Sequence, residues 1–369
     1  MVTVTGHDHP GVTAALMDVL TRHRATVEDI EQVVVHGRLL LGLVVSGDGE
    51  GTEVFRDLEA AAEVLGVDVE LETLDDAEPI VATRHHVVVL GAPLPPAALA
   101  GVTRRLAACG ANIETITRLS SWPAQSFELV VSGGDTDRLR TELAAEAVAQ
   151  EVDVAVERAS IYRRAKRLVV MDVDSTLVQG EVIEMLAAEA GCEAEVARVT
   201  AAAMAGELDF EQSLRARVAL LEGLPVEAVD KVRGAVRLTP GARTLVRTLK
   251  RLGWTVGIVS GGFTAVTDDL HEELGLDHSL ANVLEVVEGR LTGRVVGPVV
   301  DRAAKAAALR LFAEQEGLQP EQTVAIGDGA NDLDMLARAG LGIAFNAKPL
   351  VRKAADAALS VPYLDAILF

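Results

Sequence analysis

The strongest constraint on the fold is a short apolar strand that ends in two acids. Residues 168–171 are continuously apolar, which predicts a strand buried on both faces, and Asp172 and Asp174 follow it directly. In open α/β sheets, ligands bind in the crevice beyond the carboxyl ends of the strands, so these acids are candidate site residues. By itself, an Asp-x-Asp pair is equally consistent with a strand-end turn that carries solvated acids.

The C-terminal half continues this pattern. Strands alternate with helices from Leu168 onward, which predicts an α/β domain with a parallel, Rossmann-like sheet and right-handed crossovers. We expect its strands at residues 168–171, 255–259, 324–326 and 342–345. The segment after the first strand is too long for a simple crossover, so we expect a helical cap at about residues 181–238. Strands at residues 284–287 and 291–295 around Glu288-Gly289-Arg290 predict an edge hairpin.

Two of the later strands also end in polar sequence. Ser260-Gly261-Gly262 follows the second strand, where a hydroxyl and bare backbone N–H groups at a helix start would hold an anion. Lys305, on a helix that begins near Asp301, is expected to reach the same crevice. The sequence therefore predicts an anion site at these strand ends.

Further acids follow the third strand, in Gly327-Asp328-Gly329-Ala330-Asn331-Asp332. Together with Asp172 and Asp174, Asp328 and Asp332 would repel one another unless a cation neutralised them. Hard oxygen ligands with room for water and phosphate suit Mg²⁺. We therefore expect Mg²⁺ as the cofactor.

The N-terminal part contains a diverged internal repeat with an offset of 86 positions, so that Pro10 aligns with Pro96 and Val27 with Ile113. Each copy predicts the order βαββαβ, a ferredoxin-like sandwich, with the first hairpin turning at His36-Gly37. We expect domains at residues 1–76, 83–158 and 165–369. The basic cluster at residues 163–167 between the last two is predicted to be a solvated linker.

The loop Gly6-His7-Asp8-His9-Pro10-Gly11 between the first strand and helix resembles the ligand loop of ACT domains, which bind amino acids. Gly11 would let a ligand approach the backbone near a helix N-terminus. The second copy departs from the pattern, because Ala97 replaces the glycine. The resemblance implies an effector site in which Asp8 and Gly11 pair with Asn112 of the other repeat. The alternative is that both copies serve only as dimerisation modules.

Four motifs then occur in a characteristic order: Asp-x-Asp-Ser-Thr, Ser-Gly-Gly, a single lysine and Gly-Asp-Gly-Ala-Asn-Asp. This set resembles the haloacid dehalogenase (HAD) superfamily of aspartate-nucleophile phosphatases. Within it, residues 168–369 are most similar to the phosphoserine phosphatase family, with paired ACT domains as in its actinobacterial members. A family member that has lost activity is the alternative, and the intact acids argue against it.

The resemblance assigns roles to these residues. Asp172 would attack phosphorus to form an aspartyl-phosphate, and Asp174 would act as general acid and then base. Mg²⁺ would be held by Asp172, the backbone carbonyl of Asp174, and Asp328. The remaining roles are phosphate binding by Ser260, Gly261, Lys305 and Asn331, and orientation of Lys305 or a metal-bound water by Asp332.

Substrate choice would belong to the cap. Phosphoserine carries an ammonium and a carboxylate, which call for one acid and one fork-shaped base, and Glu181 and Arg217 match those family positions. Met204 and Phe210 would exclude water. Considered alone, Glu181 and Arg217 are better explained as a helix N-terminal acid and a surface cation, and the family resemblance of the surrounding sequence reverses this preference.

Composition narrows the partners and the compartment. With 34 basic and 55 acidic residues the formal net charge is −21, so nucleic acid and anionic membranes are unlikely partners. Cys109 and Cys192 are too few for a disulfide framework or a zinc site, which fits a reducing cytoplasm. We therefore expect a cytoplasmic protein, and the resemblance of the repeats to ACT domains implies a homodimer or higher homo-oligomer.

Taken together, the motifs and the family resemblance imply a Mg²⁺-dependent phosphatase that would convert O-phospho-L-serine to L-serine and phosphate, the final step of serine synthesis, with an amino-acid effector at the ACT domains. Two alternatives stay open. One is a HAD phosphatase for another small phosphorylated metabolite, and the other is an amino-acid sensor that uses the phosphatase domain as its output.

Overall fold

The computed structural model describes residues 1–47, 51–74, 83–122 and 124–369, which form two compact units, Met1–Val81 and Ala82–Phe369. Residues 75–82, which contain most of the predicted boundary between the repeats, lie outside the described ranges.

The first unit has the predicted βαββαβ order. Its elements are β1 (Val2–His7), α1 (Val12–Arg22), β2 (Thr26–Val35), β3 (Arg38–Ser46), α2 (Gly51–Leu65) and β4 (Val67–Leu71). The antiparallel sheet has the order β2-β3-β1-β4. Val2 and Val4 alternate inward from β1 against Leu16 of α1 and Leu58 of α2, which closes the core. The hairpin turns at His36-Gly37 as predicted, and both residues have positive φ.

The second repeat begins the second unit and confirms the internal duplication. It contains β5 (Arg84–Gly91), α3 (Pro96–Ala108), β6 (Ala111–Ser120), β7 (Gln125–Gly133), α4 (Thr136–Gln150) and β8 (Asp153–Arg158). Helix α3 begins at Pro96, two residues before the predicted start, because proline is well suited to the first position of a helix.

The α/β domain follows. Its strands are β9 (Leu168–Met171), β10 (Thr255–Phe263), β11 (His278–Val287), β12 (Arg290–Val296), β13 (Thr323–Gly327), β14 (Leu341–Phe345) and β15 (Ala357–Leu359). Its helices are α9 (Ala242–Arg251), α10 (Thr264–Leu274), α11 (Arg302–Gln315), α12 (Leu333–Arg338) and α13 (Pro349–Ala354). The four predicted parallel strands lie side by side in the order β10-β9-β13-β14.

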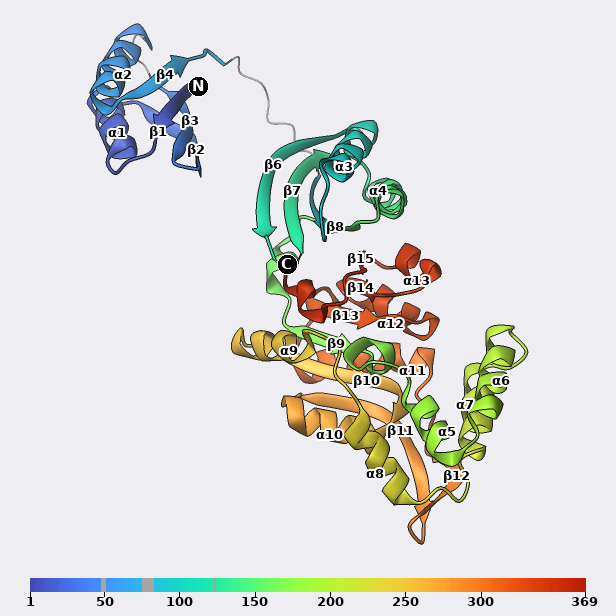
Figure 1. The fold of residues 1–369 in the computed structure, drawn as a ribbon. Helices are drawn as coiled ribbons and strands as arrows, with labels where there is room; N and C mark the ends of the chain where they lie inside the picture. Colours follow the sequence, from blue (N-terminus) through green and yellow to red (C-terminus); the bar gives the residue numbers. More distant parts are fainter. Residues whose placement is uncertain (48–50, 75–82, 123) are drawn as a thin grey trace. The chain divides into compact units, whose positions relative to one another are not determined.

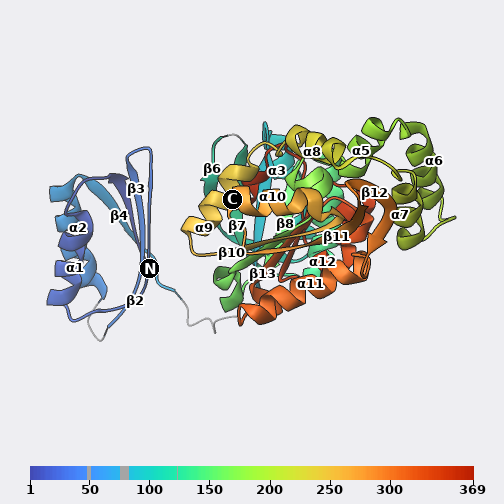
Figure 2. The same cartoon turned by 90° about the horizontal axis from the view of Figure 1, so that it is seen from below.

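Strand β9 lies at the centre of this domain and is buried on both faces, as its apolar run predicts. Val169 and Met171 pack into the layer that contains α9 and α10, whereas Leu168 and Val170 pack against α11 and α12. Figure 2 shows the two helical layers on opposite sides of the strands. This double burial fixes the position at which the chain emerges as Asp172.

The cap is inserted between β9 and α9, as predicted. It consists of α5 (Val182–Ala190), α6 (Glu193–Met204), α7 (Phe210–Ala219) and α8 (Val226–Ala235). Helix α7 begins with a capping box, in which Asp209 accepts a hydrogen bond from the Gln212 N–H and Gln212 accepts one from the Asp209 N–H. This box fixes the start of the helix that carries Phe210 and Arg217.

The edge hairpin differs in detail from the prediction. Val287 pairs with Arg290, so Glu288-Gly289 alone forms the turn and Arg290 is the first residue of β12. Strand β11 also begins at His278, well before the predicted residue 284, and its first part runs parallel to β10. The missed segment contains polar and small residues that do not resemble a strand, and pairing with β10 overrides that local preference.

The two domains of the second unit share one sheet, which was not predicted. Ala155 of β8 pairs with Ala357 of β15, and the eleven-stranded sheet has the order β12-β11-β10-β9-β13-β14-β15-β8-β5-β7-β6. Figure 1 shows β8 next to β15. The strand β8 therefore covers an edge of the α/β sheet that would otherwise be open.

The prediction of a solvated linker at residues 163–167 is wrong for Lys166. Its side chain is buried, and Nζ donates to Glu157 Oε1 at 2.9 Å and to the carbonyls of Gly340 and Glu321 at 3.1 and 3.2 Å. Arg163 is half-buried and pairs with Glu128 and Glu157. The cluster thus joins the second repeat to the α/β domain, because its cations have carboxylate partners that a sequence pattern cannot reveal.

Candidate active site

Asp172 leaves the end of β9 in a buried position. Its side chain is 3% exposed, and Oδ1 accepts a hydrogen bond from the Val173 N–H at 2.8 Å. The backbone then makes a tight turn over Val173–Leu177, in which Ser175 has a φ of +57°. Positive φ is unfavourable for a serine, so the turn that separates the two acids is locally strained.

Lys305 contacts Asp172 from the opposite side of the crevice. Its ammonium is fully buried and lies 2.6 Å from Asp172 Oδ1 and 2.7 Å from Asp332 Oδ1. Burial alone would lower the pKa of Lys305, but the charges of the two carboxylates outweigh burial and raise it. Lys305 is therefore held as a cation next to Asp172.

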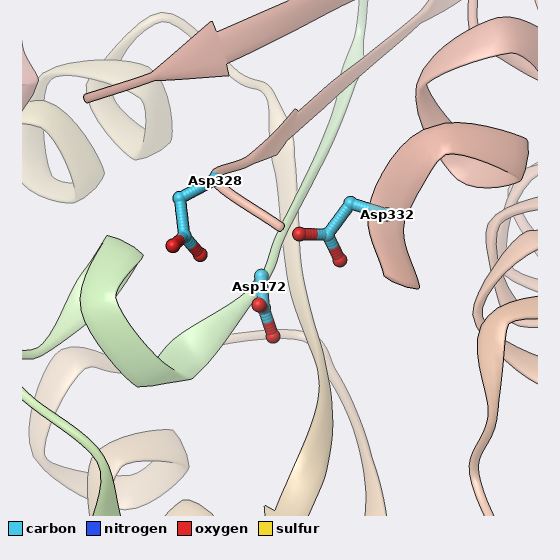
Figure 3. Close-up of side chains that lie close together, drawn as sticks. All are labelled: Asp172, Asp328 and Asp332. Carbon is cyan, nitrogen blue, oxygen red and sulfur yellow. The ribbon is translucent and has the colours of Figure 1, made fainter. Parts of the chain in front are cut away.

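Three carboxylates converge on this point. Oxygen atoms of Asp172, Asp328 and Asp332 lie within 4.8 Å of one another, and Figure 3 shows the side chains directed toward a common space. Asp332 is fully buried and also accepts a hydrogen bond from the Gly329 N–H at 3.0 Å. Gly327 permits this arrangement, because a Cβ there would lie 2.4 Å from Asp332 Cγ.

Within the part of the chain that the structure describes, the ion pairs of these acids leave an excess of negative charge. Burial, reinforced by the charge of Asp332, raises the pKa of Asp172 well above its usual value and raises the pKa of Asp328 to about 6. Lys305 supplies one positive charge for the three acids. A cluster of hard oxygen donors with excess negative charge fits a divalent cation such as Mg²⁺.

Asp174 lies in the turn Val173–Leu177, two residues after Asp172. Oδ1 accepts a hydrogen bond from the Val182 N–H at 2.8 Å, and Oδ2 accepts one from the Ser260 hydroxyl at 3.3 Å. Burial raises the pKa of Asp174 despite these bonds. A carboxyl group with a raised pKa is suited to holding and releasing a proton.

The Ser260-Gly261-Gly262 segment forms the wall beside Asp174. The Ser260 side chain is fully buried, and its Oγ accepts a hydrogen bond from the Gly262 N–H at 2.8 Å. A Cβ on Gly262 would lie 2.7 Å from Asp174 Oδ2. Glycine is therefore required where the backbone approaches the acid.

The cap contributes two half-buried charges of opposite sign. Glu181 precedes α5 and accepts a hydrogen bond from the Ser175 hydroxyl at 3.2 Å. Burial, with a contribution from the charges of Asp174 and Asp328, raises the pKa of Glu181 to about 7. Arg217 donates to the Ser213 carbonyl at 3.4 Å and forms no ion pair with any residue that the structure describes.

The pKa of Arg217 is nevertheless influenced by the charges of the nearby acids. Burial lowers its pKa, while the charges of Glu181 and Asp174 act in the opposite direction. We call Ser260-Gly261-Gly262 the anion loop. Phe210 lies against this loop, since a Cβ on Gly261 would be 2.9 Å from Phe210 Cζ. The cap is thus in contact with the core at the Ser-Gly-Gly segment.

Two other predicted residues are placed less fully. Asn331 is half-buried in the short turn Ala330–Asp332, where it directly precedes Asp332 and follows Asp328 by three residues. Met204 is the last residue of α6, and its side chain lies outside the part of the chain that the structure describes.

The predicted effector residues are divided between the two units. Gly11 precedes α1 with a φ of +100°, and a Cβ there would meet no atom within 4 Å. The exposed Asp8 donates its N–H to the Gly37 carbonyl at 2.9 Å. Asn112 is exposed on β6 of the other unit, so its pairing with Asp8 and Gly11 stays a prediction.

Sequence reasoning missed three side chains that support the site. Ser175 contacts Glu181, and the Thr176 hydroxyl donates to Asp328 Oδ1 at 3.4 Å. Both belong to the Asp-x-Asp-Ser-Thr motif, whose hydroxyls are a signal that sequence analysis could have used. Asn282 bonds to two backbone groups near the anion loop and belongs to no motif.

Comparison with known proteins agrees with this geometry. The haloacid dehalogenase-like hydrolase family matches residues 169–337, and ACT domain families match residues 1–72 and 83–157. The chain is 58% identical to a phosphoserine phosphatase of Streptomyces coelicolor, over 100% of this chain and 91% of that protein. It is 53% identical to a phosphoserine phosphatase of Mycobacterium tuberculosis, over 100% of this chain and 92% of that protein.

A solved structure of a substrate-bound phosphoserine phosphatase has a TM-score of 0.53 and 47% identity, covering 55% of this chain and 97% of that one. The fold and the acidic site thus define a haloacid dehalogenase-like hydrolase with two ACT domains. Within this class, the chain belongs to the phosphoserine phosphatase family. In the described ranges, no helix is both long and apolar enough to span a membrane.

Proposed function

We propose that this enzyme hydrolyses O-phospho-L-serine to L-serine and inorganic phosphate with Mg²⁺ as cofactor, as the final step of serine synthesis. The observation that carries the substrate assignment is the pair of half-buried charges on the cap, Glu181 and Arg217, next to Asp174. Glu181 would bind the substrate ammonium and Arg217 its carboxylate. Phe210, and Met204 by family resemblance, would exclude water.

In the first step, a carboxylate oxygen of Asp172 would attack phosphorus, and the bond between phosphorus and the serine oxygen would break. Asp174 would donate its proton to the departing oxygen, which its raised pKa supports. The phosphoryl group would then be bonded to Asp172 as an aspartyl-phosphate. Lys305 next to Asp172 would stabilise the charge on the transferring phosphoryl oxygens.

In the second step, the Asp174 carboxylate would remove a proton from water as the water oxygen attacks phosphorus. The bond to Asp172 would break, which releases inorganic phosphate and restores both acids. Ser260, Gly261 and Asn331 would hold the phosphoryl oxygens throughout. Mg²⁺, bound by Asp172, the Asp174 carbonyl and Asp328, would supply further charge neutralisation. Asp332 would orient Lys305, a role supported by their 2.7 Å contact.

The substrate assignment predicts a selective effect of Arg217→Ala. We expect KM for phosphoserine to rise by at least about tenfold, because loss of one charge-assisted contact costs roughly 1.5–3 kcal/mol. KM for p-nitrophenyl phosphate, which carries no carboxylate, should change little. Equal effects on the two substrates would argue for a different phosphorylated metabolite. As a control, Asp172→Asn should abolish turnover of both.

We also propose domain limits at residues 1–76, 83–158 and 165–369, with the cap at 181–238, and a cytoplasmic homodimer or higher homo-oligomer. The family matches support the limits, and the unbridged Cys109 and Cys192 fit a reducing compartment. An amino-acid effector at Asp8, Gly11 and Asn112 would shift the population of oligomers or cap positions. Activity and sedimentation measured across a serine titration test this, and no change in either would leave the ACT domains a purely structural role.

A further inference from the structure

Asn282 lies beside the anion loop although it belongs to none of the motifs. Its side chain is 1% exposed, and both ends of its amide are used. Nδ2 donates to the Gly261 carbonyl at 2.8 Å, and Oδ1 accepts from the Val300 N–H at 2.8 Å. The two partners are backbone groups of different elements, so one side chain joins two segments that are distant in the sequence.

The first partner lies in an interruption of the sheet. Val259 pairs with Leu280 and Phe263 pairs with Asn282, so that Ser260-Gly261-Gly262 lies opposite Ala281 alone. Such a bulge leaves backbone groups without ladder partners, and buried backbone groups need other partners. The Ser260 hydroxyl accepts from Gly262 and the Asn282 amide donates to Gly261. These two side chains therefore hold the bulge in its shape.

The second partner leads into the helix that carries Lys305. Val300 directly precedes Asp301, whose side chain accepts from the Ala304 N–H at 2.8 Å and caps α11. Lys305 lies in the first turn of this helix, and its N–H donates to the Asp301 carbonyl at 2.9 Å. The position of Val300 thus fixes the start of α11 and, with it, the position of the Lys305 backbone.

We propose that Asn282 is a positioning residue that sets the distance between the Gly261 backbone and the Lys305 ammonium, the groups that bind the phosphoryl oxygens. The inference rests on the proposed phosphate-binding role of Ser260-Gly261-Gly262 and Lys305. The position of a Cβ on Gly261, 3.8 Å from the Val300 carbonyl oxygen, shows how closely the two segments approach. Removal of the amide would let them move apart without changing any group that contacts substrate.

The test compares Asn282→Ala and Asn282→Asp with the wild-type full chain. Asn282→Asp keeps an acceptor for the Val300 N–H, but as a carboxylate it cannot donate to the Gly261 carbonyl, so it removes the contact to the loop and retains the contact to Val300. We expect kcat/KM for p-nitrophenyl phosphate to fall by about tenfold to a hundredfold in both variants, since small misplacements of catalytic groups have effects of this size. The inhibition constant of inorganic phosphate should rise in parallel.

Thr323→Val is the matched control. Thr323 is fully buried at the start of β13, whereas the site lies beyond the other end of this strand. Its hydroxyl donates to the Pro320 carbonyl at 2.7 Å and accepts from the Gly340 N–H at 3.3 Å. This variant also loses two bonds to backbone groups, so its melting temperature should fall comparably. Its activity and phosphate affinity should stay close to wild type.

Asn282 variants that keep wild-type kcat/KM and phosphate affinity would overturn the proposal, as would a Thr323→Val enzyme with an equal loss of both. If Asn282→Ala does not fold, Asn282→Asp decides, because it is isosteric with the native residue. Neither probe contains serine, so failure of the serine assignment leaves this test intact. Hydrolysis that survives Asp172→Asn would instead reject the phosphatase mechanism itself.

Discussion

The buried charges of the site differ in how well they are compensated. Lys305 lies between Asp172 and Asp332 at hydrogen-bond distance from both. Among the described residues, the Glu181 carboxylate has only the Ser175 hydroxyl as a hydrogen-bond partner, and its pKa is raised to about 7 by burial and neighbouring acids. In the absence of a ligand, the Glu181 carboxyl therefore exchanges between its protonated and ionised forms near neutral pH.

This property predicts a pH-dependent contribution of Glu181 to stability. Its pKa is raised from 4.5 in the unfolded chain to about 7, so the folded state retains the proton longer. The contribution is fully present below pH 4.5 and is lost as the pH rises through about 7. In metal-free protein, the free energy of unfolding should therefore fall by about 2–3 kcal/mol more in the wild type than in Glu181→Gln between pH 5 and pH 8.

Urea denaturation with EDTA at several pH values measures this difference. Parallel pH profiles for the wild type and Glu181→Gln would contradict the raised pKa. Glu211→Gln is a suitable control, because Glu211 is exposed on the same cap and forms an exposed ion pair with Arg215. Its profile should follow that of the wild type.

At the scale of secondary-structure elements, the contact between α7 and β10 determines how the cap meets the core. Gly261 at the end of β10 leaves room for the Phe210 ring at the start of α7, since a Cβ there would lie 2.9 Å from Phe210 Cζ. Because the ring belongs to a helix fixed by its capping box, it has limited freedom to move away.

We therefore expect Gly261→Ala to displace the Phe210 ring from the Ser260-Gly261-Gly262 segment and lower kcat/KM for p-nitrophenyl phosphate by about tenfold. The same substitution should have a smaller effect in a Phe210→Ala background, with a coupling of about 0.5–3 kcal/mol in a double-mutant cycle. Gly234→Ala in cap helix α8 is the control, because a Cβ there meets no atom within 4 Å. Equal effects of Gly261→Ala in both backgrounds would show that the steric contact is unimportant.

The elements also show what the sequence could and could not predict. The strands β9, β10, β13 and β14 follow from apolar runs, and the cap follows from the length of the segment after β9. The positions of Asp172, Asp174, Ser260 and Asp328 at the strand ends follow from the parallel topology. Asn282 could not be predicted, because its partners are backbone groups 18 to 21 residues away and it lies in a segment without strand character.

At the scale of the whole chain, the second repeat belongs to the same structural unit as the α/β domain and not to the unit of the first repeat. The second repeat shares its sheet with the α/β domain through β8 and β15, and charged pairs such as Arg140–Asp356 and Arg352–Asp153 lie across the same junction. The sequence marked residues 163–167 as a linker because the carboxylate and carbonyl partners of Lys166 are remote in the chain. Ala82–Phe369 is thus one structural unit.

We expect calorimetry to resolve two unfolding transitions, one for Met1–Val81 and one for Ala82–Phe369. Lys166→Met should lower the melting temperature of the second transition only. The variant loses a buried cation with three hydrogen bonds and leaves Arg163 as the ionic partner of Glu157, which should cost about 1–3 kcal/mol. Lys231→Met, which removes an exposed pair with Glu189, should change stability by less than about 1 kcal/mol. A separate transition for residues 83–158, or an unchanged melting temperature in Lys166→Met, would contradict this description.

The pairing of β8 with β15 also imposes an order on biosynthesis. The ribosome completes β8 at Arg158 long before it reaches β15 at Ala357–Leu359. Domains fold from the N-terminus during synthesis, so the second repeat presents the β8 edge while most of the α/β domain is still being translated. The last strand of the chain then docks on a preformed template. During this interval the β8 edge carries backbone N–H and C=O groups without ladder partners, which is the kind of edge on which another chain can pair.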